Sequence, residues 1–90
     1  MNKYITVTQE DIIQGERLHA RWCPLALAIQ REFKGCDVTV SDLIRISCHG
    51  ETQFWRYSDS AARFIYEFDN AKTAKPGRFQ ITSRFQITRI

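Results

Sequence analysis

The sequence predicts an α+β domain: a small antiparallel β-sheet with two main helices packed on one face. Residues 24–34 and residues 59–70 each carry apolar side chains at helical spacing. Short β-branched segments lie before, between and after these two stretches, with the alternation typical of half-buried strands. The expected chain order is β-α-α-β-β-β-α-β. The 90 residues form a single domain, residues 1–90, near the lower size at which one hydrophobic core suffices.

The N-terminal part is expected to form a strand followed by a short helix. Residues 3–8 alternate in type and include β-branched side chains, which favours a strand. Thr8 is a candidate N-cap, and Asp11 three residues later completes an Asp variant of the capping box. The helix over residues 9–14 would end at Gly15 and direct its two isoleucines to the core.

A polar connection over residues 16–22, expected to be exposed and mobile with two hydrophobic anchors, leads to the central helix. This helix, residues 24–34, has Pro24 at the first helical position and Cys23 as its N-cap. Gly35 follows as a left-handed stop. Because most of its side chains are apolar, the sequence predicts a mostly buried helix.

Three strands are expected between the two main helices. They cover residues 38–40, 43–48 and 52–57, and residues 49–51 are expected to form a hairpin connection between the last two, with Gly50 at a positive φ.

The C-terminal third is expected to form the second helix, residues 59–70, which Asn70 ends, and a terminal strand over residues 78–90. The pentapeptide Arg-Phe-Gln-Ile-Thr occurs twice in this strand, beginning at Arg78 and again at Arg84. Since the copies are six residues apart, both should keep the same alternation. The second copy is expected to overhang the sheet, to bend, or to pair with another chain.

Charge is distributed unevenly along the chain. Residues 1–70 hold eight Lys or Arg against ten Asp or Glu, whereas residues 71–90 hold five basic residues and no acid. A basic arm on a mildly acidic body suggests an anionic partner, and the alternative is a solvated strand face. The candidate binding residues are Lys72, Lys75, Arg78, Arg84 and Arg89 in this arm, with Arg17, Arg21, Arg45 and Arg56 elsewhere.

Enzymatic and metal chemistry find little support. No phosphate loop, GxSxG or HExxH motif is present, so we expect no enzyme and no cofactor. Cys23, Cys36 and Cys48 do not match a zinc-ligand spacing with His19 and His49, and we interpret them as reduced thiols of a cytosolic protein. No apolar run approaches the roughly 20 residues of a membrane span, so no membrane partner is expected.

An aromatic segment offers a second candidate surface for nucleic acid. Phe54, Trp55 and Tyr57, with Arg45 and Arg56, could form a sheet on which bases stack. The alternative is that these aromatic side chains belong to the core. One face of the hairpin must meet solvent, so at least one aromatic side chain should be partly exposed.

Several runs resemble a pattern found in small bacteriophage proteins, some of which are similar to anti-CRISPR proteins. The runs are ITVTQEDIIQG at residues 5–15, CPLALAI at residues 23–29, FIYEFD at residues 64–69 and FQI at residues 79–81. The resemblance covers most of the chain in order and rests on fold-forming residues. The repeated terminal pentapeptide departs from the pattern.

The resemblance implies a phage-encoded inhibitor that binds a type I CRISPR-Cas surveillance ribonucleoprotein and blocks target DNA recognition. Its partners would be Cas proteins, with contact to guide RNA, in the cytoplasm of the infected host cell, and it would act as a monomer or homodimer. The alternatives are a stand-alone RNA or single-stranded DNA binder and a protein-interaction module that dimerises through its last strand.

Overall fold

A computed structural model describes residues 2–87, with side chains described for residues 2–83. The elements are β1 (Asn2–Val7), α1 (Gln9–Gln14), α2 (Pro24–Glu32), β2 (Asp37–Val40), β3 (Ile44–Cys48), β4 (Glu51–Tyr57), α3 (Asp59–Asp69) and β5 (Gly77–Ile87). The predicted α+β class and chain order are confirmed.

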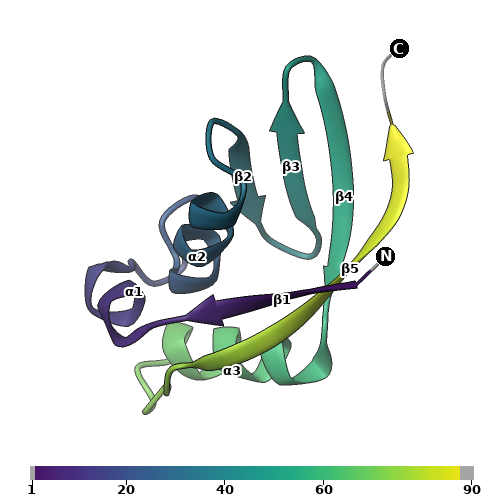
Figure 1. Ribbon diagram of the computed structural model, residues 1–90. Helices are drawn as coiled ribbons and strands as arrows, with labels where there is room; N and C mark the ends of the chain where they lie inside the picture. Colours follow the sequence, from purple (N-terminus) through teal and green to yellow (C-terminus); the bar gives the residue numbers. More distant parts are fainter. Residues whose placement is uncertain (1, 88–90) are drawn as a thin grey trace.

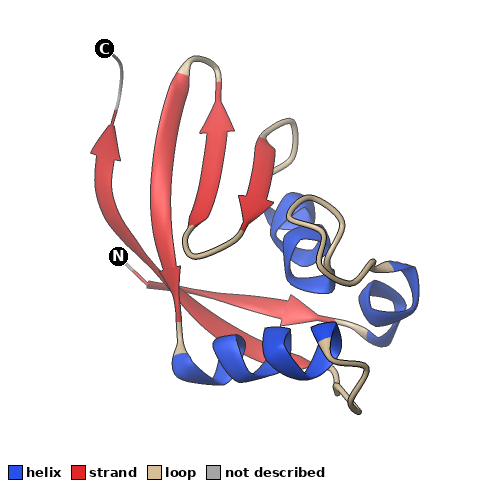
Figure 2. Cartoon of the chain, turned by 180° about the vertical axis from the view of Figure 1, so that it is seen from behind, coloured by secondary structure: helices blue, strands red, loops and turns tan. Residues whose placement is uncertain are grey.

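The five strands form one antiparallel sheet in the order β1-β5-β4-β3-β2. The sheet is strongly curled, so that β1 runs across the direction of β3 and β4 (Figure 1). Helix α2 contacts both edge strands, β1 and β2, and therefore fills the inside of the curl. Figure 2 shows α3 running beside β5 and β1, at the end of the sheet away from the β3–β4 turn.

Helix α2 begins where local chemistry predicts. Pro24 occupies the first turn, and the Cys23 sulfur accepts a hydrogen bond from the Ala26 N–H at 3.4 Å. The helix ends at Glu32, two residues earlier than predicted, and Gly35 then adopts the left-handed φ of 81°.

One hydrophobic core lies between the sheet and the helices. Cross-strand pairs place inward-facing side chains opposite one another, and α2 and α3 add theirs to the same cluster. Its largest fully buried side chains are Ile5, Val7, Leu25, Ile29, Val38, Ile44, Ile46 and Ile81. The Phe64 ring of α3 lies 5.1 Å from the Phe79 ring of β5, between ring centroids. Both main helices therefore cover the same face of the sheet, as predicted.

Helix α1 is held to α2 by an ion pair. The predicted capping box is confirmed, since Thr8 and Asp11 exchange side chain–backbone hydrogen bonds. The Arg31 guanidinium donates to both oxygens of the Asp11 carboxylate, at 2.9 Å each, and also to the Thr6 carbonyl. Asp11 is only 4% exposed, so this bidentate pair compensates a buried charge.

Several predictions in the helical part are wrong in detail. Ile13 is 69% exposed, because the short helix turns only Ile12 towards the core. Leu18 is 82% exposed and Trp22 about half exposed, so neither anchors the connection as expected. After α3, the left-handed residue is Ala71 (φ 60°), one position beyond Asn70.

Both halves of β5 pair within the chain. Residues 77–82 pair with β1, and most positions from Ile81 to Ile87 pair with β4. The strand is described from Gly77 to Ile87, and the predicted continuation over residues 88–90 lies outside the described residues.

The two copies of the repeated pentapeptide do not share one register with β4. Ile81 pairs with Tyr57 and Ile87 pairs with Thr52, so six steps along β5 match five along β4. The extra residue lies opposite the Gln53–Trp55 stretch, where the register shifts. The two copies therefore meet β4 in different backbone registers.

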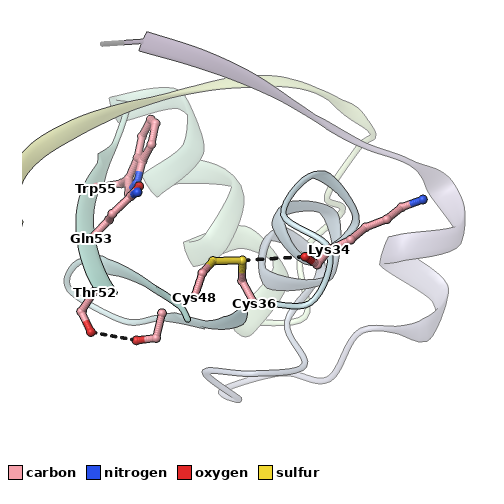
Figure 3. Close-up of a disulfide and its surroundings, with 7 residues drawn as sticks. Lys34, Cys36, Cys48, Thr52, Gln53 and Trp55 are labelled. Atoms are coloured by element: carbon pink, nitrogen blue, oxygen red, sulfur yellow. Dashed lines mark hydrogen bonds between the residues drawn. A yellow bond between two sulfur atoms is a disulfide. The ribbon is translucent and has the colours of Figure 1, made fainter. Parts of the chain in front are cut away.

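The prediction of three reduced thiols is wrong for two of them. A disulfide joins Cys36 and Cys48, across the open end of the β2–β3 hairpin (Figure 3). The antiparallel register brings these cysteines together, because Asp37 pairs with Ser47. Cys23 is free and buried.

Among the described helices, none combines the length and apolar character needed to cross a bilayer.

Candidate nucleic-acid interface

The face of the sheet opposite the helices carries a mixture of arginine, aromatic and small polar side chains. Its positions alternate with the buried ones along every strand, and the register sets them beside one another. The central part of this face consists of Tyr4, Thr6, Thr39, Arg45, Ser47, Thr52, Phe54, Arg56, Arg78, Gln80 and Thr82.

Three of these residues, Arg45, Arg56 and Arg78, are exposed and supply one guanidinium to each of three adjacent strands. None forms an ion pair within the described part of the chain. The Arg78 guanidinium lies over the Tyr4 ring, 4.7 Å from its centroid, which fixes it by a cation–π contact. We call this side of the sheet, with Arg45, Arg56 and Arg78 at its centre, the arginine face.

Few acidic side chains lie on the same side of the sheet as these arginines. Among described residues, the strand positions on this side include one acid, Asp37 at the start of β2. Its carboxylate is already bound by the Arg21 guanidinium. The face therefore keeps a local positive charge, although the chain as a whole carries only +3.

The predicted aromatic platform is only partly present. Trp55 is 3% exposed, packs on the Phe33 ring at 5.9 Å and donates its indole N–H to Gln53. Tyr57 also points inward and donates its hydroxyl to the Ser41 carbonyl at 2.7 Å. Of the three aromatic residues proposed for stacking, Phe54 alone lies on the arginine face.

The second aromatic residue on the arginine face is Tyr4, and not Trp55 or Tyr57 as predicted. It is 54% exposed and lies across from Gln80 on β5. The alternation of residues 3–8 contains the signal, because a buried Ile5 puts Tyr4 on the opposite side of β1. What the sequence could not supply was the long-range pairing of β1 with β5, which sets Tyr4 beside Arg78.

The described residues of the predicted basic arm do not all lie on one side of the sheet. Lys72 and Lys75 are exposed in the α3–β5 connection, and Lys75 lines a hollow beside Arg63 and Phe64 on the helix-covered side. Arg78 belongs to the arginine face instead. The side chain of Arg84 and all of Arg89 lie outside the described residues.

The remaining candidates, Arg17 and Arg21, lie in the connection between α1 and α2. Arg17 is exposed, and Arg21 is engaged with Asp37. The structure therefore brings together Arg45, Arg56 and Arg78, and leaves Arg17, Lys72 and Lys75 apart from them.

Cys23, which lies four residues after His19, has a structural role at the start of α2. The Cys23 N–H donates to the His19 carbonyl at 3.0 Å, and the Cys23 sulfur serves as the N-cap of α2. Burial raises the pKa of the Cys23 thiol, which keeps it protonated and poorly nucleophilic at neutral pH. Across the described residues, no three His, Cys, Asp or Glu side chains gather as a metal-binding group.

Comparisons with known proteins find no matching family model, no matching curated protein and no matching solved structure.

Proposed function

We propose that the protein is a stoichiometric inhibitor that binds a ribonucleoprotein through the arginine face. The preferred target is a type I CRISPR-Cas surveillance complex, in line with the resemblance of the sequence to small phage proteins of the anti-CRISPR type. The observation that carries the proposal is a set of three guanidinium groups that form no ion pair among the described residues, beside two aromatic rings on the side of the sheet opposite α2 and α3.

The chemistry of this face suits a phosphate backbone. Arginine guanidinium groups bind phosphates through parallel pairs of N–H···O bonds. Three strands about 4.8 Å apart present three such groups, so one bound strand of nucleic acid can meet more than one of them. Occupying guide RNA and adjacent Cas surface in this way would exclude target DNA without any chemical step.

A second candidate function is a stand-alone binder of RNA or single-stranded DNA. It is favoured by the exposed Tyr4 and the partly buried Phe54 among the arginines, because accessible aromatic rings stack on unpaired bases. This function would require no Cas protein.

Binding measurements separate the two. Purified protein is titrated against a type I surveillance complex and, separately, against its naked guide RNA. Inhibition predicts tight, saturable binding to the complex and at least tenfold weaker binding to the RNA, a difference of about 1.4 kcal/mol or more. Equal affinity for both favours the stand-alone binder, and binding to neither contradicts both functions.

A matched pair of variants tests the surface itself. Arg56→Glu on the uncovered side should weaken binding at least tenfold, whereas Arg63→Glu on α3, which makes the same change of charge, should have little effect. Both arginines are exposed and lack ion pairs within the described residues, so the variants differ mainly in which side of the sheet they alter. Equal losses for both variants would show that only net charge matters.

A further inference from the structure

A cleft of about 350 Å³ opens on the helix-covered side, between the α1–α2 connection, the end of β2 and α3. Apolar and aromatic side chains form part of its lining, namely Leu18, Val40, Tyr57 and Ile65. Two carboxylates, Asp42 and Asp69, lie among them. The volume is near the lower limit for ligand pockets, which suits one inserted side chain better than a large ligand.

Both carboxylates lack a cationic partner. Asp42 makes no hydrogen bond or ion pair with any described residue. Asp69 accepts one hydrogen bond, from the Leu18 N–H at 2.9 Å, and forms no ion pair within that part of the chain. On a chain with an excess of basic residues, this cleft is therefore locally acidic.

The charge of these carboxylates reaches the groups that line the cleft. Burial raises the pKa of Tyr57, and the negative charge of Asp42 raises it further. Burial likewise raises the pKa of Cys23, and Asp69 contributes in the same direction. A cation entering the cleft would experience the same two charges as attraction.

The rim of the cleft is held in place before any partner binds. Leu18 adopts a left-handed φ of 56°, fixed by its hydrogen bond to Asp69. The Val40 N–H donates to the Ala20 carbonyl at 2.9 Å, which ties the connection to β2. The Glu16 N–H donates to the Trp22 carbonyl at 2.8 Å, which closes the base of the loop. A preformed rim lowers the ordering cost of binding.

We propose that this cleft binds an arginine side chain of a partner protein. The aliphatic stem of the arginine would pack against Leu18, Val40 and Ile65, while its guanidinium would meet Asp42 and Asp69. Tyr57 adds an aromatic wall, which favours a cation in the same place. Charge complementarity therefore selects a basic protein segment and disfavours nucleic acid at this site.

The cleft and the arginine face lie on opposite sides of the sheet, because Val40 and Tyr57 belong to the covered side. The protein would thus present a basic face to nucleic acid and an acidic cleft to protein. This inference does not depend on the proposed function, since the cleft could bind a protein whether or not the arginine face binds RNA.

The test uses a blocked tripeptide, acetyl-Leu-Arg-Leu-amide, titrated into the full ¹⁵N-labelled chain without nucleic acid. A short peptide should bind weakly, with a Kd on the order of millimolar. We expect saturable amide shifts confined to the lining of the cleft, including Leu18, Asp42 and Asp69. The neutral peptide acetyl-Leu-Gln-Leu-amide should bind at least threefold more weakly.

Two single substitutions complete the test. Asp42→Asn should weaken arginine-peptide binding at least threefold, whereas Asp59→Asn, at the far end of α3 from Asp69, should leave it unchanged. Asp42 is exposed and unpaired within the described residues, so its loss should not disturb folding. The proposal is wrong if no saturable shifts occur in the cleft, if the two peptides bind equally, or if Asp42→Asn has no effect. None of these results bears on the arginine face.

Discussion

The two sides of the sheet differ completely in chemistry, although the same strands build both. The covered side is lined by aliphatic and aromatic side chains packed against α2 and α3, and the uncovered side carries arginines, Tyr4, Phe54 and small polar residues. Alternate residues of one strand therefore serve different purposes. Substitutions of buried side chains on the covered side should alter stability, whereas substitutions of the exposed arginines on the uncovered side should alter nucleic-acid binding.

The largest effect is expected on the covered side, in α2. Ile29 is fully buried, and Ile29→Ala removes apolar volume that neighbouring side chains cannot refill. We expect the free energy of unfolding to fall by about 2–5 kcal/mol, measured by urea denaturation. The matched change on the uncovered side, Arg56→Ala, should cost no more than about 0.5 kcal/mol. Similar losses for the two variants would contradict the division between the sides.

The second-largest loss of stability is expected when the disulfide is removed. It closes a loop with a sequence separation of 12 residues, so replacing both Cys36 and Cys48 by Ser should cost about 2–4 kcal/mol through greater freedom of the unfolded chain. Thermal unfolding with and without a reducing agent measures the same effect, and the double variant is the control that should not respond to reduction. A wild-type protein insensitive to reductant would contradict a stabilising disulfide.

A pH-dependent contribution is expected from Asp11. Burial alone would raise the pKa of this carboxyl, but the bonds from Arg31 and Thr8 outweigh burial and hold it below its ordinary value of 3.8. The unfolded chain therefore binds the proton more readily, and the stabilisation is complete above about pH 4 and is lost as the pH falls through the folded-state value.

Arg31→Ala should lower the free energy of unfolding by about 1–3 kcal/mol at neutral pH, because it removes both guanidinium donors from a buried carboxylate and leaves it the Thr8 N–H. Urea denaturation between pH 3 and pH 6 should show a flatter acid slope for this variant than for the wild type. Identical slopes would mean that Asp11 does not hold a lowered pKa.

Local chemistry made much of the fold predictable. The capping box at Thr8, the N-cap at Cys23, the left-handed Gly35 and the amphipathic α3 all depend on residues within one helical turn. The predicted hairpin turn is also present, with positive φ at both His49 and Gly50.

The features that escaped prediction depend on contacts between distant residues. Arg31 reaches Asp11 across 20 positions, and Cys36 meets Cys48 only because β2 and β3 pair in one register. The alternation of β4 put Phe54 and Trp55 on opposite faces, but no local signal showed which face would be buried. The register shift between β4 and β5 likewise arises from strand pairing, and the repeated pentapeptide does not predict it.

The sequence predicted which arginines belong to the candidate site, but it did not predict which of them lie together. The sequence singled out Arg45, Arg56 and Arg78, but assigned Arg78 to an arm with Lys72 and Lys75. Because the sheet order places β5 beside β4, Arg78 joins the arginines of the hairpin instead. The strand order decides which arginines are neighbours, and the distribution of charge along the sequence does not reveal the strand order.

The central claim is that the uncovered face binds a nucleic-acid backbone, and the salt dependence of binding tests it most directly. Affinity for the guide-RNA-containing complex is measured from low to high salt for the wild type, for Arg45→Ala with Arg56→Ala, and for Arg63→Ala as control. Each arginine that neutralises a phosphate of a single strand should contribute about 0.7 to the slope of log K against log salt concentration. We predict that the double variant loses about that amount for each arginine while the control keeps the wild-type slope. Equal slopes for all three proteins would contradict the claim.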